Sequence, residues 1–252
     1  MDVLETVPTR RRTAADAVVE LRQYTLKPGS RDTLIDLFER EFVETQEAEG
    51  MSVLGQFRDL DDPERFVWLR GFPDMTTRAR SLTAFYDGPV WAAHRDAARA
   101  TMVDTDDVLL LRPAGPGMGL RRPGTRPPVG AAALPPTLVT ATICHLDASA
   151  EDGFLAFHQR LVDPALRAAG APALATLVTE PAANGYPRLP VREGARVLVR
   201  LAAFLDRAAY DRHLAALARS PAWRLASAEM DAALSRPVET LRLAPTARSA
   251  IR

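Results

Sequence analysis

One set of short motifs occurs twice in this chain, and this internal repeat constrains the fold more than any other feature. Three motifs recur 132 residues apart: Phe72-Pro73-Asp74 as Phe204-Leu205-Asp206, Pro89-x-Trp91 as Pro221-x-Trp223, and Leu109-x-Leu111-x-Pro113 as Leu241-x-Leu243-x-Pro245. Gly50 and Gly170 are only 120 residues apart, so the second copy carries about 12 extra residues, which we place in the turn-rich stretch 181–187. A repeat of this length indicates two related domains rather than a solenoid.

Hydrophobic periodicity and turn residues predict strand, helix, two strands, helix and strand in each copy. In the first copy the strands are expected at 18–26, 51–58, 66–72 and 107–112, with helices at 30–50 and 74–86 and another from Pro89. In the second copy they are expected at 138–146, 171–179, 196–204 and 238–243, and a helix at 149–169 should kink at Pro164. This order is that of the ferredoxin-like unit.

The repeat predicts an α+β fold with tandem ferredoxin-like domains. We expect a disordered lead-in (1–17), a first domain (18–113), a Pro/Gly/Arg-rich linker (114–136), a second, divergent domain (137–245) and a tail (246–252). A four-stranded sheet with helices on one face needs cover on its other face. Strands at 108–111 and 197–201 are apolar on both faces, so two antiparallel sheets packed face to face as a pseudo-dimer are favoured over independent domains.

Composition limits the possible partners. The 252 residues include 32 basic and 32 acidic side chains, and this zero net charge argues against a nucleic-acid or anionic-membrane binder. No apolar run approaches the roughly 20 residues of a membrane span. The single cysteine rules out an internal disulfide, and residues 1–17 lack the apolar region of a secretory signal. We therefore expect a cytoplasmic protein.

Several separated motifs of the first copy occur in the order found in a known family. They are residues 20–29 (ELRQYTLKPG), 56–63 (QFRDLDDP), 66–72 (FVWLRGF) and Phe85-Tyr86-x-Gly88-Pro89-x-Trp91-x-x-His94-Arg95. With these motifs, residues 18–113 resemble the NIPSNAP family, and residues 137–245 resemble it only through the repeat. The resemblance implies the dimeric α/β-barrel superfamily, which includes antibiotic-biosynthesis monooxygenases, haem-degrading monooxygenases and chlorite dismutases. It does not imply one reaction, because fold does not fix function.

Side chains that one copy has and the other lacks are the candidates for a site. Alanine stands at 218 and 226, where the repeat would place Tyr86 and His94. We hypothesise a polar pocket in the first domain with His94 as the catalytic acid or base, the alternative being an ordinary surface or hydrogen-bonded histidine. Trp91 recurs as Trp223, which favours a helix-anchoring core residue, with a pocket wall as the alternative.

Arginines on three predicted strands can converge on one ligand group. Arg22 and Tyr24 share a face of the first strand with Glu20, and Arg58 and Arg70 lie on the next two. Arginine suits carboxylate or carbonyl recognition, and cross-strand pairing with Glu20 or with neighbouring acidic side chains is the alternative for each of them. We assign Arg22, Tyr24, Arg70, Tyr86 and Trp91 as substrate-binding residues.

Known motifs for metals and common cofactors do not occur. The sequence has no Cys-x-x-Cys, His-Glu-x-x-His, Gly-x-Gly-x-x-Gly, Walker loop or Gly-x-Ser-x-Gly. We therefore expect no metal and no cofactor. A haem protein with His94 as the axial ligand is a third interpretation, after the two functions described next.

The function predicted from these features is that of a small-molecule enzyme on an apolar or aromatic metabolite. The resemblance implies a cofactor-independent, monooxygenase-like or isomerase-like activity, and a homodimer. The alternative is a non-catalytic ligand-binding or protein-interaction module of the same family.

Overall fold

The computed structural model describes residues 15–121, 125–147 and 151–252, and its strands form one closed barrel. The strands of the first half are β1 (Val18–Leu26), β2 (Ser52–Asp59), β3 (Arg65–Phe72) and β4 (Met102–Pro113). Those of the second half are β5 (Leu138–His145), β6 (Ala173–Thr179), β7 (Val197–Phe204) and β8 (Glu239–Pro245). The order around the barrel is β1-β3-β2-β8-β5-β7-β6-β4, with every pairing antiparallel. The α+β prediction is confirmed, and the two sheets also join edge to edge through β2–β8 and β4–β6.

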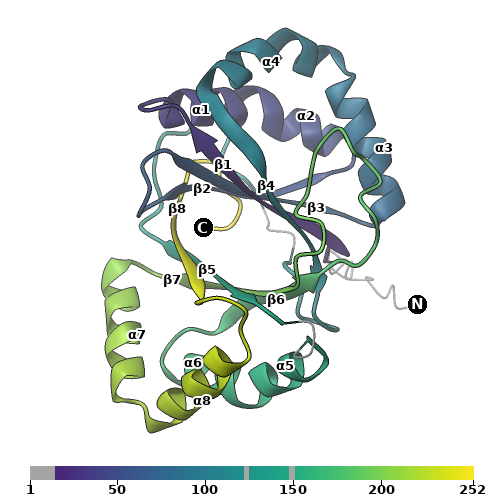
Figure 1. Ribbon diagram of the computed structural model, residues 1–252. Coiled ribbons are helices and arrows are strands. Elements are labelled where there is room, and N and C mark those ends of the chain that lie inside the picture. The colour runs from purple at the N-terminus through teal and green to yellow at the C-terminus, as the bar shows by residue number, and fades with distance from the viewer. Residues whose placement is uncertain (1–14, 122–124, 148–150) are drawn as a thin grey trace, which may run out of the picture.

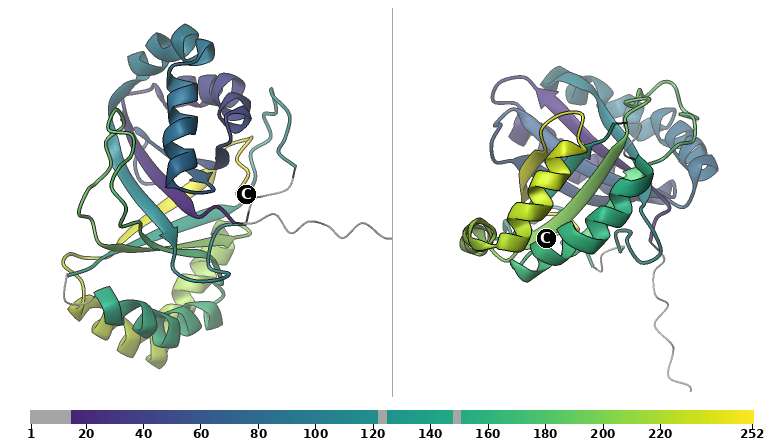
Figure 2. Two further views of the ribbon diagram at one scale, coloured as in Figure 1. Left: turned by 90° about the vertical axis from the view of Figure 1, so that its right-hand side faces the viewer. Right: turned by 60° about the horizontal axis from the view of Figure 1, so that its bottom comes forward.

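Helices cover the barrel on two opposite sides (Figure 1). Those of the first half are α1 (Arg31–Leu37), α2 (Val43–Ala48), α3 (Met75–Tyr86) and α4 (Pro89–Thr101). Those of the second half are α5 (Glu151–Phe157), α6 (Asp163–Ala168), α7 (Arg207–Arg219) and α8 (Pro221–Ala232). The left view of Figure 2 also shows the two helical layers apart, with the barrel between them. No helix in the described part of the chain has the length and hydropathy needed to cross a membrane.

The alternation along β1 separates two cores. Val19 and Leu21 point into the barrel, where they pack with strand residues of both halves such as Leu201. Tyr24 lies on the outer face, in the core between the first sheet and helices α1–α4. This outer face also carries Glu20 and Arg22, because side chains two residues apart share one face of a strand. The first sheet therefore presents a charged stripe to its own helices.

Two helices that the sequence predicts as continuous are each interrupted by a π-helical turn. These turns, Phe38–Phe42 and His158–Val162, stand 120 residues apart. Pro164 follows the second turn, at the start of α6. The first copy has Glu44 at the matching place and makes the same π turn, so Pro164 does not cause the interruption.

Element boundaries differ from the predictions mainly at β4 and near the second hairpin. β4 begins at Met102 rather than 107, because the backbone of residues 102–104 continues to pair with β1 although Val103 and Asp104 are exposed. β6 begins two residues later than expected, at Ala173. Asp74 is the N-cap of α3, and its side chain accepts from the Thr77 amide.

The segments predicted as lead-in, linker and tail each include residues that pack against the rest of the protein. The first 14 residues of the lead-in lie outside the described residues, but Asp16 is buried and accepts from Ser52. Leu120 of the linker joins the barrel core, and Arg126 donates to the Val53 carbonyl and to Glu47. The tail is held by buried Arg248.

Arg248 connects three segments, and its loss should be costly. Its amide donates to Glu39 at 2.9 Å, its Nε donates to the Pro127 carbonyl at 3.0 Å, and its guanidinium pairs with Glu44. We expect Arg248→Ala to lower the free energy of unfolding by about 2 kcal/mol, since hydrogen bonds to charged groups contribute roughly that much. Urea unfolding measures this change. Arg252→Ala, at an exposed position, is the control and should change little.

Candidate functional site

A cavity of about 230 Å³ lies between the first sheet and its helices. Eight aromatic residues line it: Tyr24, Phe38, Phe42, Trp68, Phe85, Tyr86, Trp91 and Tyr186. Polar groups reach it from β4 (Thr105 and Asp106), from the helical side (Gln46 and Arg99) and from Arg188. A concave, mainly apolar space with a few polar groups is the usual form of a small-molecule site.

The π-helical turn supplies one wall of this cavity. Phe38 and Phe42 stand four residues apart on it, and their rings contact each other edge to face. Phe38 packs on Trp68 of β3 with ring centroids 4.8 Å apart, and Phe42 packs on Trp91 of α4 at 5.6 Å. Such turns widen a helix locally and are frequent at functional sites. These contacts fix the rings, so the cavity exists before any ligand binds.

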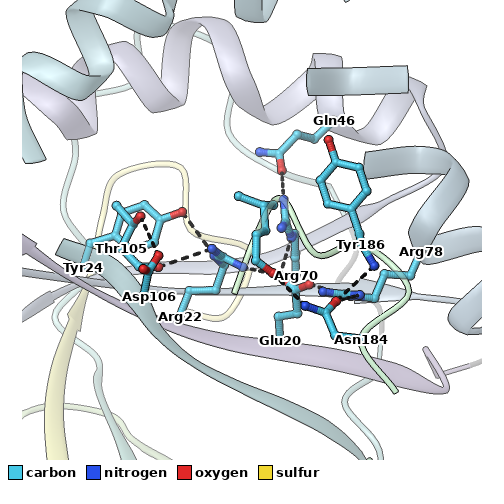
Figure 3. Close-up of polar contacts among 11 residues, drawn as sticks. Glu20, Arg22, Tyr24, Gln46, Arg70, Arg78, Thr105, Asp106, Asn184 and Tyr186 are labelled. Atoms are coloured by element: carbon cyan, nitrogen blue, oxygen red, sulfur yellow. Dashed lines mark hydrogen bonds and ion pairs between the residues drawn. The ribbon is translucent and has the colours of Figure 1, made fainter. Parts of the chain in front are cut away.

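A buried charge cluster lies at the sheet side of the cavity (Figure 3). Glu20 has no exposed surface and accepts from Arg22 at 2.8 Å, Arg70 at 2.7 Å and Arg78 at 2.7 Å. We call these four residues the Glu20 cluster. It holds three cations and one anion, so its net charge is positive inside a region that water does not reach. Burial by itself would raise the pKa of Glu20, but the attraction of Arg70, Arg22 and Arg78 outweighs burial and lowers it far below the ordinary value.

The Glu20 cluster reaches the cavity through two side chains. Arg22 donates from Nε to the hydroxyl oxygen of Tyr24 at 3.1 Å, and Arg70 donates to the amide oxygen of Gln46 at 3.1 Å. Burial raises the pKa of Tyr24 although Arg22 opposes the change, so its phenol stays protonated near neutral pH. Because Tyr24 accepts from Arg22, its own proton is free for a ligand. Tyr24 is thus a hydrogen-bond donor backed by positive charge.

Several buried donors around the Glu20 cluster have no hydrogen-bond partner among the described residues, including one terminal nitrogen each of Arg70 and Arg78 and the hydroxyl of Tyr186. Buried guanidinium nitrogens are seldom left without an acceptor, because desolvation without a replacement bond costs free energy. This part of the molecule therefore favours a ligand that brings an acceptor oxygen.

The loop between β6 and β7, which belongs to the second half, covers the cavity of the first half. In Figure 1 it rises in green along the barrel to α3. Asn184 accepts from Arg78 at 2.9 Å, Tyr186 stacks on Tyr86 with ring centroids 6.2 Å apart, and Arg188 pairs with Asp87 at 2.6 Å. The loop contains the 12 or so extra residues that distinguish the second copy. The first cavity is therefore complete only with both halves of the chain.

The structure brings five of the six predicted site residues together. Tyr24, Tyr86 and Trp91 line the cavity, and Arg22 and Arg70 lie in the Glu20 cluster behind it. The pairing with Glu20 that we gave as the alternative for these arginines is also present. Arg58, by contrast, pairs with Asp32 at the surface.

His94 is not among the cavity-lining residues. Its ring lies against Phe42, and its Nε2 is 3.5 Å from Glu41 with a third of the side chain exposed. The catalytic role of His94 stays a prediction, and its position matches the alternative of a surface histidine beside a carboxylate.

Sequence reasoning missed several residues of the site, among them Asp106, Arg78, Gln46 and Tyr186. Arg78 falls on the apolar face of its helix with Leu82 and Phe85, and a charge on such a face is a signal for a buried partner. Gln46 follows Phe42 by four residues, so it also faces inward. Tyr186 carries no such signal, because a turn-rich loop has no periodicity.

The described residues contain no group of three His, Cys, Asp or Glu side chains that could hold a metal ion.

Comparison with solved structures supports the fold. A candidate monooxygenase from Lactobacillus acidophilus NCFM is 12% identical, with a TM-score of 0.55 over 91% of this chain and 94% of that one. A candidate monooxygenase from Fusobacterium nucleatum is 9% identical, with a TM-score of 0.57 over 92% and 93%. An anthrone oxidase-like protein is 13% identical, with a TM-score of 0.56 over 93% of each. At such identity the likeness extends to the fold alone.

Sequence comparison finds a family match in the first half of the chain. The curated proteins contain no match to this chain. The family model named NIPSNAP matches residues 19–115, which span β1 to the end of β4 and contain the Glu20 cluster. Residues 19–115 are therefore similar to the NIPSNAP family, and this match covers less than half of the chain.

Proposed function

We propose that this protein is an enzyme that binds a small aromatic ketone or phenol in the first-half cavity and oxidises its enolate or phenolate with dioxygen. The observation that carries this proposal is the meeting of an aromatic cavity with the Glu20 cluster, whose three arginines outnumber its one carboxylate. An excess of buried positive charge stabilises an oxyanion more than the neutral molecule from which it forms. Ionising the substrate is also what makes an aromatic carbon electron-rich enough to reduce dioxygen.

Anthrone is a suitable model substrate, because one fold neighbour is described as anthrone oxidase-like. Its ring carbonyl stands opposite an acidic CH2 group. Loss of one CH2 proton gives an oxyanion on the carbonyl oxygen, and dioxygen then converts the CH2 carbon to a second carbonyl. One dioxygen is consumed for each anthrone, one oxygen atom enters the quinone, and the other leaves as water.

The residues divide this chemistry between them. Tyr24 donates a hydrogen bond to the developing oxyanion, and Arg22 behind it supplies the charge. Asp106, the carboxylate in the cavity lining, accepts the CH2 proton. The aromatic walls formed by Phe42 and Trp91 hold the ring and exclude water.

Oxygen uptake with anthrone tests this proposal. We expect uptake well above the rate without protein, with anthraquinone as product. Thr105→Trp fills the cavity from β4 with a residue that strands tolerate and should abolish the difference. Binding of anthrone without oxygen uptake would instead support the second interpretation, a non-catalytic ligand-binding module.

Tyr186 should contribute to ligand binding. Its hydroxyl is buried and without a partner among the described residues, and it belongs to the cavity lining. We expect Tyr186→Phe to weaken anthrone binding by up to about tenfold, the value of one hydrogen bond. Quenching of tryptophan fluorescence measures the affinity. His94→Ala should leave it unchanged, and a clear loss there would restore His94 to the site.

We also propose that the chain is a tandem of two ferredoxin-like units with the boundaries given above. Support comes from the barrel, in which β4-β1-β3-β2 and β8-β5-β7-β6 are contiguous. The predicted homodimer would have to use the helical surfaces, where Leu205 and Leu225 are exposed, because every barrel strand is paired on both sides. Sedimentation analysis decides between monomer and dimer.

A further inference from the structure

The second half of the chain contains a cavity of its own, at the place that corresponds to the first. It measures about 320 Å³ and lies between the outer face of the second sheet and helices α7 and α8. Its wall is mainly apolar, with Leu198, Leu217, Trp223 and Met230 among the lining residues. Trp223 stands where the repeat places Trp91, so each copy sets a tryptophan from its last helix against a cavity.

The charge cluster of the first cavity has no counterpart here. Thr140 pairs with Ala202 between β5 and β7, just as Glu20 pairs with Arg70 between β1 and β3. Tyr210 stands 132 residues after Arg78, so the repeat places it at the position of Arg78. In the second copy, Thr140, Ala202 and Tyr210 therefore stand at the positions of Glu20, Arg70 and Arg78. Thr142 stands at the position of Arg22, so the second copy keeps none of the four charged residues.

The one buried cation of this cavity is compensated. Arg200 pairs with Asp163 at 3.0 Å and donates to the Ala171 carbonyl. Asp231 also lines the cavity, at an exposed position. The second cavity thus offers no excess positive charge, and an anionic ligand would meet a carboxylate without gaining an arginine.

Two imidazoles are among the polar groups that remain in the lining of this cavity. His158 is 2% exposed and lines the cavity. Burial and nearby Arg200 lower the pKa of His158 to about 4, so the ring is neutral near pH 7 and offers one donor and one acceptor. His213 donates from Nδ1 to the Ala169 carbonyl at 2.9 Å, which leaves its Nε2 as an acceptor.

We propose that the second cavity is a separate binding site for a neutral, mainly apolar small molecule that carries a hydroxyl or carbonyl group. The aliphatic and aromatic wall holds the apolar part, and His158 and His213 bind the oxygen. The two cavities of the chain then differ in the charge of the ligand they accept, the first favouring an oxyanion and the second a neutral molecule. This site does not depend on the oxidation proposed for the first cavity.

A matched pair of ligands and a matched pair of variants test this site. The ligands are naphthol, which is neutral near pH 7, and naphthoate, which is an anion of the same ring size. Thr105→Trp fills the first cavity, and Thr240→Trp fills the second from an exposed position on β8. In the Thr105→Trp background we expect calorimetry to show naphthol binding at least about tenfold tighter than naphthoate.

Adding Thr240→Trp to that background should remove the naphthol binding, while the melting temperature confirms folding. Naphthol binding that survives the double substitution, or naphthoate binding equal to naphthol, would overturn the proposal. A crystal of the unaltered protein soaked with bromonaphthol gives an independent answer. We expect anomalous signal beside His158, and signal confined to the first cavity would contradict this site.

Discussion

Glu20→Gln is expected to lower the free energy of unfolding by about 3–5 kcal/mol, the usual cost of removing one partner from a buried ion cluster. The substitution keeps the size of the side chain but leaves Arg22, Arg70 and Arg78 without their shared carboxylate. All four side chains have 1% exposure or less, so water cannot replace the lost charge. Urea unfolding near pH 7 measures the effect.

Glu41→Gln is the matched control for this substitution. Glu41 faces His94 at 3.5 Å in a partly exposed pair, and such pairs contribute about 1 kcal/mol or less. Equal losses for the two variants would mean that the Glu20 cluster is not shielded from water as the structure indicates.

The contribution of Glu20 should also depend on pH. Its pKa is lower in the folded protein than the value of about 4.3 expected in the unfolded chain. The stabilisation is therefore complete above that unfolded value and is lost as the pH falls through the lower folded pKa. The difference in stability between the unaltered protein and Glu20→Gln should shrink progressively below about pH 4.

Asp106→Asn is expected to reduce anthrone oxidation by a factor of about 10² to 10⁴, the range for loss of a general base. The amide keeps the shape of the side chain but cannot accept the CH2 proton. Asp106 lies at an exposed position at the edge of the cavity, so its loss should leave the folded structure intact. Initial rates of oxygen uptake at saturating anthrone measure the effect.

The control for Asp106 is its neighbour on the same strand. Asp104→Asn changes an exposed carboxylate that does not line the cavity, and the new amide oxygen can still accept from the Asp106 amide. We expect unchanged rates. Loss of activity in both variants would point to damage to β4 rather than to a missing base.

The barrel could be predicted from the sequence because its determinants are periodic. Alternation along 18–26 places Val19 and Leu21 on one face and Arg22 and Tyr24 on the other, and the structure sorts them into two cores. The repeat gave the order of elements in both halves, since each Pro-x-Trp motif opens a helix.

The parts that could not be predicted depend on contacts between distant segments. Asn184 meets Arg78 across 106 residues, and nothing in a turn-rich loop indicates where it will dock. The π-helical turn escaped prediction because Phe38 and Phe42, four residues apart, fit an ordinary helix equally well. The argument for His94 used its absence from the second copy, but the same absence holds for Glu20 and Arg78, which the structure places in the buried cluster behind the cavity.

Oxidation of anthrone in heavy-isotope dioxygen tests the central claim most directly. The account predicts protein-dependent formation of anthraquinone with one labelled oxygen atom in the new carbonyl, at a rate that falls sharply in Asp106→Asn. Anthraquinone formed no faster than in buffer, although anthrone binds in the first cavity, would contradict the enzymatic function.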